Sequence, residues 1–243
     1  MTATFSSFIK KKFLGGNKNL VHLNDPYEVM RDLLRGREVT GIIDAGASTG
    51  RISKRLLKRF PNADVYAFEP NPVFAEALQN YANQDLRVHP QLVALSDHEG
   101  SAEFYLTKSP GSTSLFAPGH RMKETHPEGS TVINTKKVEL VTIDGWAKRN
   151  GNPAIQLMKF DIQAGELLAL RGAVQTLHSS TLLVYAEVWF NPMYEEGALF
   201  SEIDLFLRQN GFLLYDMYKL RYDSKGLIFS GCAIFVNAQK LGI

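Results

Sequence analysis

The sequence Gly41-Ile-Ile-Asp-Ala-Gly-Ala-Ser-Thr-Gly50 joins a short apolar run to a turn with two glycines. The apolar run is typical of a buried strand, and the glycines allow a tight connection to a following helix. A second apolar run ends at Glu69, 19 residues after Gly50. A carboxylate at the end of the next strand suits the 2′- and 3′-hydroxyls of a ribose. These two segments predict a site for a nucleoside-type cofactor. The alternative is a plain strand-to-helix turn with a solvated Glu69.

The residues of the turn narrow the choice of cofactor. Arg51 stands where a dinucleotide-binding turn has its third glycine, and the Gly-Lys-Ser/Thr ending of a P-loop is absent. The turn therefore fits S-adenosylmethionine, which carries adenosine and an amino acid but no phosphate. Asp44 is expected to orient backbone amides or to bind the ammonium of that cofactor. The cofactor-binding residues predicted in these segments and after the third strand are Asp44, Gly46, Ala47, Ser48, Gly50, Glu69, Pro70, Asn71, Ser96 and Asp97. For Ser96 and Asp97 the alternative is a simple turn.

Composition sets the broad class. The chain has 243 residues, of which 44% are apolar, and this is enough for one globular domain with a sizeable core. The 27 basic and 25 acidic residues nearly balance, so we expect no nucleic-acid partner. The single cysteine, Cys232, excludes an internal disulfide and favours a cytoplasmic location.

No apolar run has the length of a transmembrane segment. The segment from Phe5 to Lys18 combines phenylalanines with lysines and either contacts an anionic membrane surface or packs on its own domain.

Strand and helix patterns alternate along most of the chain. Asp25-Pro-Tyr-Glu28 marks the start of a helix in an N-terminal helical extension over 1–38, which precedes the main domain over 39–243. Strands are predicted over 39–44, 64–68, within 86–95, and over 155–160, 182–188, 212–218 and 229–236. Helices are predicted over 51–60, over 72–81 with Asn71 as the cap, in a short segment capped by Asp144, from 164, and over 198–209. The last two strands are joined by a loop too short for a crossover helix, so they are antiparallel. We therefore predict an α/β, doubly wound, mostly parallel seven-stranded sheet with a reversed last strand.

An insertion of about 102–141 interrupts this alternation. Two further strands, 102–106 and 137–141, are predicted to pair as a hairpin around a long polar loop, Thr107 to Lys136. A loop of this length in a compact domain is usually functional or disordered. We expect it to cover the acceptor and to become ordered on binding.

Four segments, taken in order, resemble the FkbM-type S-adenosylmethionine-dependent methyltransferases. They are Ile43-Asp-Ala-Gly-Ala-Ser-Thr-Gly50, Ala67-Phe-Glu-Pro-Asn-Pro72, Ala94-Leu-Ser-Asp97, and Met158-Lys-Phe-Asp-Ile-Gln-Ala-Gly-Glu166. Ser112-Thr-Ser-Leu115 is similar to the family's Ser-Ser-Leu stretch. The resemblance covers about Val39 to Val236 and implies a Rossmann-like class I methyltransferase fold.

The catalytic candidates lie at the predicted carboxyl ends of strands. A hydroxyl acceptor needs a group that takes its proton, and Asp161 is the first candidate, its other role being to cap the next helix. Glu187 lies in an apolar strand, where a carboxylate needs a site role or an ion pair. Lys159 either holds a nearby carboxylate or faces solvent. The catalytic set is thus Asp161, Glu187 and Lys159.

The substrate set includes one departure from the family. Gln163 replaces a common Glu, so this side chain cannot ionise, but it can hydrogen-bond a substrate hydroxyl. In the family, a His usually follows shortly after the Glu that Glu187 matches. Here Glu187 is followed by Val188 and Trp189 instead. The residues predicted to contact substrate are Gln163, Glu166, Ser114, His120 and Trp189. His126 is a further candidate, and Trp189, Phe190 and Tyr194 are expected to form an apolar or sugar-stacking wall. The alternatives are a first helical turn for Glu166, exposure to solvent for the two histidines, and packing for the three aromatic residues. No ligand spacing indicates a metal site.

These observations predict an O-methyltransferase that uses S-adenosylmethionine. The expected acceptor is a hydroxyl of a sugar, a glycan or another small natural product. An NAD-linked oxidoreductase is the first alternative, although the third glycine and a Tyr-x-x-x-Lys pair are missing. A non-catalytic nucleoside-binding module is the second, and Gln163 is its best support. The sequence does not indicate an oligomeric state.

Overall fold

The computed structural model describes residues 25–243. The segment from Phe5 to Lys18 with its predicted membrane contact, and the first part of the helical extension, lie outside these residues. The helices are α2 (Pro26–Leu33), α3 (Arg51–Leu57), α4 (Pro72–Ala82), α5 (His120–Thr125), α6 (Pro127–Ser130), α7 (Ile143–Arg149), α8 (Glu166–Arg171), α9 (Val174–Ser179), α10 (Phe200–Gln209) and α11 (Ala238–Leu241), with a 3-10 turn, η1 (Pro110–Ser112). The strands are β1 (Gly41–Ala45), β2 (Asp64–Phe68), β3 (Val88–Gln91), β4 (Ala94–Leu95), β5 (Gly100–Thr107), β6 (Val132–Val141), β7 (Leu157–Phe160), β8 (Leu183–Trp189), β9 (Phe212–Tyr222) and β10 (Ile228–Asn237).

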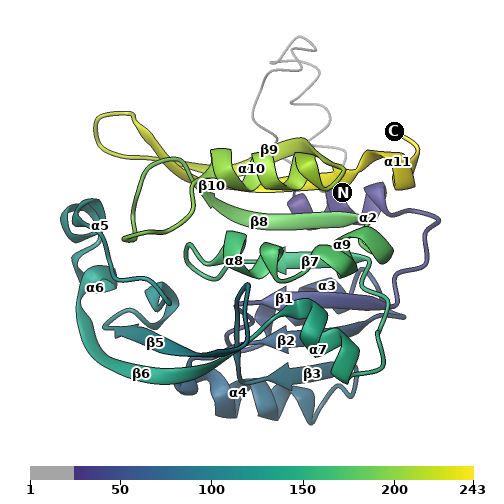
Figure 1. Cartoon of the computed structure of the whole chain (residues 1–243), viewed down its shortest axis with the longest axis horizontal. Helices are drawn as coiled ribbons and strands as arrows, with labels where there is room; N and C mark the ends of the chain where they lie inside the picture. The colour runs from purple at the N-terminus through teal and green to yellow at the C-terminus, as the bar shows by residue number, and fades with distance from the viewer. Residues whose placement is uncertain (1–24) are drawn as a thin grey trace, which may run out of the picture.

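Seven strands form the main sheet, in the order β3-β2-β1-β7-β8-β10-β9 (Figure 1). The pairs β2–β3, β1–β2, β1–β7 and β7–β8 are parallel. Strand β10 runs antiparallel to both of its neighbours, β8 and β9. The prediction of a mostly parallel seven-stranded sheet with a reversed last strand is confirmed.

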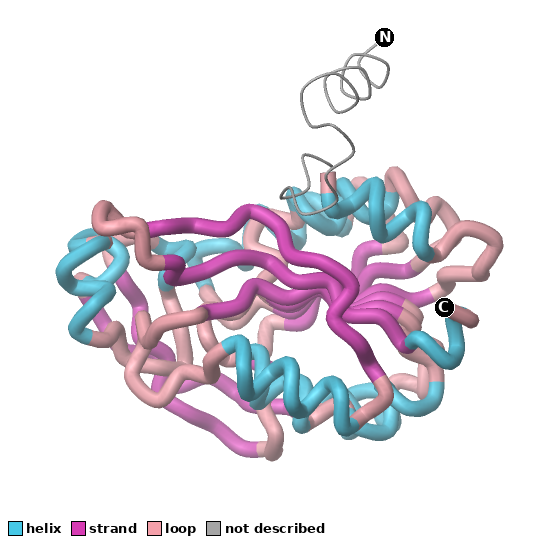
Figure 2. Tube along the Cα trace, turned by 90° about the horizontal axis from the view of Figure 1, so that it is seen from above, coloured by secondary structure: helices cyan, strands magenta, loops and turns pink. Residues whose placement is uncertain are grey.

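Helices cover both faces of this sheet, as a doubly wound fold requires. On one face, α7, α8, α9 and α10 bury Trp146, Leu170 and Leu207 in a single apolar cluster. On the other face, α2, α3 and α4 contribute to a second cluster, which contains Met30 and Leu56. Figure 1 shows the first group of helices in front of the sheet, and Figure 2 shows helices on either side of the strands. No helix within residues 25–243 is long and apolar enough to cross a bilayer.

Two helix starts follow the predicted capping residues. The Asp25 carboxylate accepts a hydrogen bond from the Tyr27 amide at 3.1 Å, at the start of α2. The Asn71 side chain accepts one from the Val73 amide, also at 3.1 Å, at the start of α4. Each satisfies a backbone donor that the first turn of a helix leaves free.

The prediction that Asp144 caps the helix that contains it, α7, is wrong. Thr142 caps α7, because its hydroxyl accepts from the Gly145 amide at 2.9 Å. The Asp144 carboxylate instead accepts from the amides of Gln175 and Thr176, at 2.8 and 2.9 Å, at the start of α9. A sequence pattern identifies a capping residue type but not which of two neighbouring helices it serves.

The insertion is more regular than predicted. Strands β5 and β6 pair antiparallel, as expected, and β4 joins them in a separate three-stranded sheet. The segment predicted as a loop, Thr107 to Lys136, contains η1, α5, α6 and the first residues of β6. Those first residues of β6 are exposed and lack apolar alternation, so only their pairing with β5 makes them a strand. Figure 1 shows the hairpin, α5 and α6 beside one end of the main sheet.

Candidate active site

The register of the parallel strands brings the predicted site residues to one edge. Ala45 is paired with Phe68 on β2 and with Phe160 on β7, and Phe160 is paired with Ala186 on β8. The residue that follows each of these four therefore lies at the same level of the sheet. The four following residues are Gly46, Glu69, Asp161 and Glu187.

The glycine turn is built so that backbone lies against backbone. Gly46 has a φ of +72°, and a Cβ at this position would lie 1.9 Å from the Asp161 carbonyl oxygen. Only glycine fits there. Gly50, with a φ of +78°, ends the turn and starts α3. The amides of Gly46 and Ala47 both donate to the Phe68 carbonyl, which fixes the turn to the end of β2.

A buried ion pair supports this turn. Lys159 Nζ lies 2.9 Å from Asp44 Oδ1 and also donates to the carbonyls of Ala45 and Gly46, at 2.9 and 3.0 Å. Ser53 donates to the second Asp44 oxygen at 2.7 Å. Although burial disfavours the charged ammonium, attraction by Asp44 and by the nearby Asp161 carboxylate holds the pKa of Lys159 above its usual value. Neither Lys159 nor Asp44 lines the two cavities described below. The structure thus shows the second role expected of Lys159, holding a nearby carboxylate, and its catalytic role stays a prediction.

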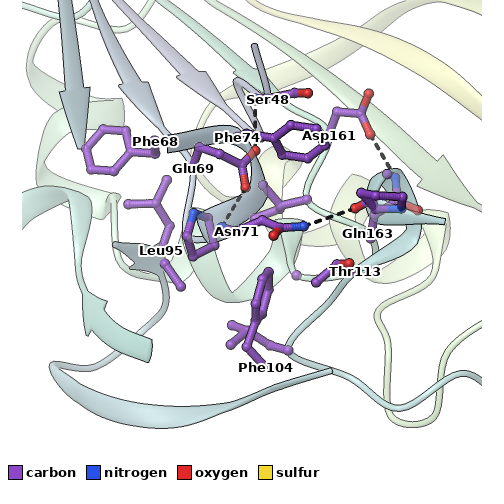
Figure 3. Close-up of a pocket in the computed structure, with 18 of the residues that line it drawn as sticks. Ser48, Phe68, Glu69, Asn71, Phe74, Leu95, Phe104, Thr113, Asp161 and Gln163 are labelled. Atoms are coloured by element: carbon purple, nitrogen blue, oxygen red, sulfur yellow. Dashed lines mark hydrogen bonds between the residues drawn. The ribbon is translucent and has the colours of Figure 1, made fainter. Parts of the chain in front are cut away.

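Glu69 lines a cavity of about 270 Å³ at the ends of β1, β2 and β7 (Figure 3). Its carboxylate accepts from the Ser48 amide at 2.9 Å and from the Asn71 amide at 2.8 Å. Burial raises the pKa of Glu69, and these two hydrogen bonds oppose the rise. A carboxylate oxygen accepts more than one hydrogen bond, so Glu69 keeps capacity for further donors, such as ribose hydroxyls.

The walls of this first cavity are partly apolar. Phe68, Phe74 and Leu95 come from the main fold, and Phe104 comes from β5 of the insertion (Figure 3). The insertion is held over the cavity by a hydrogen bond of 3.3 Å from the Asn71 side chain to the Pro110 carbonyl. An apolar slot next to a carboxylate and a glycine-lined backbone fits adenosine. Of the predicted cofactor residues, Gly46, Ser48, Glu69, Pro70 and Asn71 line this cavity.

Ser96 and Asp97 do not line it. Asp97 lies 2.7 Å from the His98 ring and forms the turn that was the alternative for this segment. The cavity is lined instead by the three residues directly before Ser96, which are Val93, Ala94 and Leu95. Pairing of β4 with β6 turns this segment toward the insertion and leads Ser96 away from the cavity. Ala47 and Gly50 also lie outside the lining and act through the shape of the turn.

The Gln163 side chain lies between two carboxylates. Its Nε2 donates to Asp161 Oδ1 at 2.9 Å and to Glu187 Oε2 at 2.8 Å, and its Oε1 accepts from the Tyr194 hydroxyl at 2.7 Å. Both amide hydrogens are thus used within the protein. Asp161 does not cap α8, whose first turn has no side-chain cap. Figure 3 shows Asp161 and Gln163 beside the first cavity.

A second cavity, of about 240 Å³, lies on the other side of these residues. It is lined by Glu187 and Trp189 from β8, by Met122 from α5 and by Phe229 from β10. Asp161 and Gln163 line both cavities, so the two meet at these side chains. This arrangement offers one site for a cofactor and another for an acceptor, with carboxylates where they join.

Burial raises the pKa of Glu187 well above its usual value, and the neighbouring carboxylates of Asp161 and Glu166 raise it further. Arg221, whose guanidinium lies 3.8 Å from the Glu187 carboxylate, opposes the rise. A carboxylate in such surroundings takes up a proton more readily than an exposed one, which suits a group that receives a proton from a hydroxyl.

Three predicted substrate residues lie elsewhere. Glu166 is buried, accepts from the Ile162 amide at 2.9 Å, and has a pKa raised by burial to about 7. Ser114 is buried and donates to the Gln163 carbonyl at 2.6 Å. His120 lies on α5 with 88% of its side chain exposed and lines neither cavity, so the structure does not bring it to the other predicted site residues. His126, the other loop histidine, lines the second cavity instead.

Several lining residues were not predicted. Arg221 comes from β9, and Met122 and Phe229 come from two other distant segments. None carries a local signal. Met122 and Phe229 meet through the packing of the insertion against β10, and Arg221 is placed by the pairing of β9 with β10. Tyr194 was expected to form an apolar wall, and its hydroxyl contact with Gln163 was not foreseen. The described residues contain no group of three or more His, Cys, Asp or Glu side chains placed to hold a metal ion.

Comparison with known proteins gives a family match over most of the chain. The family model described as "Methyltransferase FkbM domain" matches residues 44–214. The "2-O-methyltransferase NoeI" of Sinorhizobium fredii (strain NBRC 101917 / NGR234) is 27% identical over 165 residues, which are 63% of this chain and 65% of NoeI. The "Methyltransferase sdnD" of Sordaria araneosa is 28% identical over 193 residues, which are 70% of this chain and 73% of that protein.

Solved structures also resemble the chain. The precorrin-6y C5,15-methyltransferase of Geobacter metallireducens GS-15 superposes with a TM-score of 0.47 at 13% identity, covering 90% of each chain. The magnesium protoporphyrin IX methyltransferase of Synechocystis PCC 6803, solved with bound S-adenosylmethionine, superposes with a TM-score of 0.45 at 10% identity, covering 87% of this chain and 77% of that one.

Proposed function

The chain belongs to the FkbM methyltransferase family, and we propose that it transfers a methyl group from S-adenosylmethionine to a hydroxyl of a sugar, a glycan or another small natural product. The observation that carries this proposal is the meeting of two cavities at Asp161 and Gln163. One cavity fits adenosine, and the other presents a buried carboxylate. A hydroxyl acceptor is also supported by the description of one relative, NoeI, as a 2-O-methyltransferase.

The first cavity is assigned to the cofactor. Glu69 would hold the ribose hydroxyls, and Phe68, Phe74 and Leu95 would pack on the adenine. The glycine turn would let the backbone approach the amino-acid part, since a side chain at Gly46 has no room. When bound, S-adenosylmethionine supplies a methyl group on a positively charged sulfur and is converted to S-adenosylhomocysteine.

The second cavity is assigned to the acceptor. Trp189 and Phe229 give it aromatic walls, and Asp161 and Glu187 also line it, with Asp161 shared with the first cavity. A hydroxyl placed beside these carboxylates would lose its proton to one of them as its oxygen gains the methyl group. Positioning of the two reactants in line, together with this proton acceptor, accounts for the chemistry that the protein itself must supply.

Two experiments test the function. Isothermal titration measures binding of S-adenosylmethionine and S-adenosylhomocysteine to the purified protein. A screen with tritium-labelled S-adenosylmethionine then measures methyl transfer to glycans and natural-product alcohols. We expect binding that Glu69→Ala weakens, and transfer that Asp161→Asn or Glu187→Gln slows strongly. Absence of cofactor binding would refute the methyltransferase assignment. Transfer only to amines or thiols would refute the hydroxyl acceptor.

A further inference from the structure

Tyr194 is a buried side chain whose hydroxyl meets the site through another residue. It is 2% exposed, and its edge packs against Trp189 with ring centroids 5.7 Å apart. Its hydroxyl oxygen lies 2.7 Å from Gln163 Oε1 and 3.1 Å from the Ser112 carbonyl oxygen. Because the carbonyl and the amide oxygen are both acceptors, the hydroxyl must be the donor in this contact.

Together with the two carboxylates, that contact holds the Gln163 amide in one orientation. With Oε1 engaged by Tyr194, the NH₂ group of Gln163 faces the carboxylates of Asp161 and Glu187. The reversed amide would place its oxygen against two carboxylates and its NH₂ against the Tyr194 hydroxyl. The observed orientation therefore satisfies every polar group of the Gln163 side chain, whereas the reversed one would keep a partner only for its NH₂ group, at the Tyr194 hydroxyl oxygen.

The backbone at Gln163 is also held in an uncommon conformation. Gln163 and Ala164 have φ angles of +56° and +76°, in the left-handed region that few non-glycine residues adopt. Two hydrogen bonds stabilise this backbone conformation. The Ser114 hydroxyl donates to the Gln163 carbonyl, and the Ala198 amide donates to the Ala164 carbonyl. Strain of this kind concentrates where a side chain must be aimed.

We propose that Tyr194 is a positioning residue that acts through Gln163 to hold Asp161 and Glu187 in the arrangement that receives the acceptor's proton. This inference rests on the proposed function only for its catalytic consequence. Its physical content concerns residues of this chain alone: Tyr194 aims the Gln163 amide, and the amide places one N–H on each carboxylate.

The consequence for Glu187 follows from hydrogen bonding. A donor to a carboxylate favours its charged form, so Gln163 opposes the effect of burial on the Glu187 pKa. The titratable or charged groups that face Glu187 from the elements around it are Asp161 after β7, Glu166 on α8, Arg221 on β9, Cys232 on β10 and His126 after α5. None of these is altered by removing the Tyr194 hydroxyl, which isolates the contribution of the Tyr194–Gln163 contact.

The test is a carboxyl titration in the cofactor-free protein. Carbon-13 NMR of protein labelled at Glu side-chain carboxyls follows Glu187, which is assigned from its loss in Glu187→Gln. We expect Gln163→Asn to raise the Glu187 pKa, because the shorter amide cannot reach both carboxylates while asparagine still tolerates a positive φ. We expect Tyr194→Phe to raise it by a smaller amount. The double variant should titrate as Gln163→Asn alone, since Tyr194 acts only through Gln163.

Tyr215→Phe is the matched control. It makes the same chemical change at a tyrosine of β9 that is 47% exposed and lines neither cavity, so the Glu187 pKa should not change. Thermal unfolding of each variant identifies any that fails to fold, and Gln163→Glu, which keeps the side-chain length and adds a charge, then replaces Gln163→Asn. A titration unchanged by Tyr194→Phe, or shifts that add in the double variant, would overturn the proposal.

Activity gives an independent readout. If the protein transfers methyl groups, the acidic limb of the kcat profile should move to higher pH in Tyr194→Phe, and the KM for S-adenosylmethionine should change little. Failure of the proposed function is detected separately, as absence of cofactor binding to the wild-type protein. The NMR result stands in either case.

Discussion

Lys159 and Asp44 form an ion pair of 2.9 Å, with 3% and 0% of their side chains exposed. Removing one partner leaves the other charge buried and unpaired, which costs about 3–5 kcal/mol in comparable cases. We therefore expect Lys159→Met to lower the free energy of unfolding by an amount in that range, measured by urea denaturation. Lys58→Met, at the exposed end of α3, is the control and should change it little. Comparable losses in the two variants would contradict the importance of the pair.

Glu69→Ala should weaken cofactor binding and also reduce stability. The amides of Ser48 and Asn71 lose their acceptor in this variant, and an unsatisfied buried donor costs about 1–3 kcal/mol. We expect at least a tenfold rise in the Kd for S-adenosylmethionine by isothermal titration. Glu76→Ala, on the solvent side of α4, serves as the control. Binding that is equal in the two variants would remove Glu69 from the cofactor site.

Asp161→Asn and Glu187→Gln should separate chemistry from binding. A positioned carboxylate that takes a proton contributes roughly 10²–10⁴-fold to a rate. We expect kcat to fall by about this factor in at least one variant, while the Kd for S-adenosylhomocysteine stays within about threefold of the wild-type value. Retention of full kcat in both variants would show that another group receives the proton.

Glu166 should make stability depend on pH. Burial raises its pKa to about 7 in the folded chain, against 4.5 for an unperturbed Glu. Between these two values the unfolded chain releases the proton and the folded chain keeps it, so stability falls as pH rises through this window. The upper bound is about 3 kcal/mol. Glu166→Gln should lose less stability than the wild type between pH 5 and pH 8 in urea denaturation. Equal pH dependence in the two proteins would contradict this prediction.

Ligand binding should protect the insertion from proteolysis. The segment Thr107 to Thr131 forms one wall of the first cavity through Pro110 and Thr113. A ligand in that cavity contacts the wall and reduces its local opening. We expect S-adenosylhomocysteine to slow tryptic cleavage after Lys108 and Arg121 several-fold, measured by mass spectrometry. Cleavage after Lys148, on α7, gives the reference rate. Unchanged rates at the first two positions would argue against contact between the ligand and the insertion.

The sequence predicted the main sheet because its signals there are local. Strand β2, Asp64–Phe68, has the predicted bounds, and the reversed last strand follows from the short loop before it. The convergence of Glu69, Asp161 and Glu187 was also predictable, since parallel strands present their carboxyl ends at one edge.

The detailed contacts were not predictable from local patterns. Gln163 is aimed by a left-handed backbone that no glycine in the sequence marks, and by a hydroxyl 31 residues away. Lys159 had two open alternatives, and only the packing of β7 against β1 selects the ion pair. His120 had the residue type of a site but lies on an exposed helix position, which depends on how α5 packs.

The place of β10 in the sheet has a consequence for synthesis of the chain. This strand is the last in sequence, yet it lies between β8 and β9. The sheet reaches its final order only after residue 237 has left the ribosome. A polypeptide halted before Ile228 leaves β8, the strand that carries Glu187, with an unpaired edge open to other nascent chains.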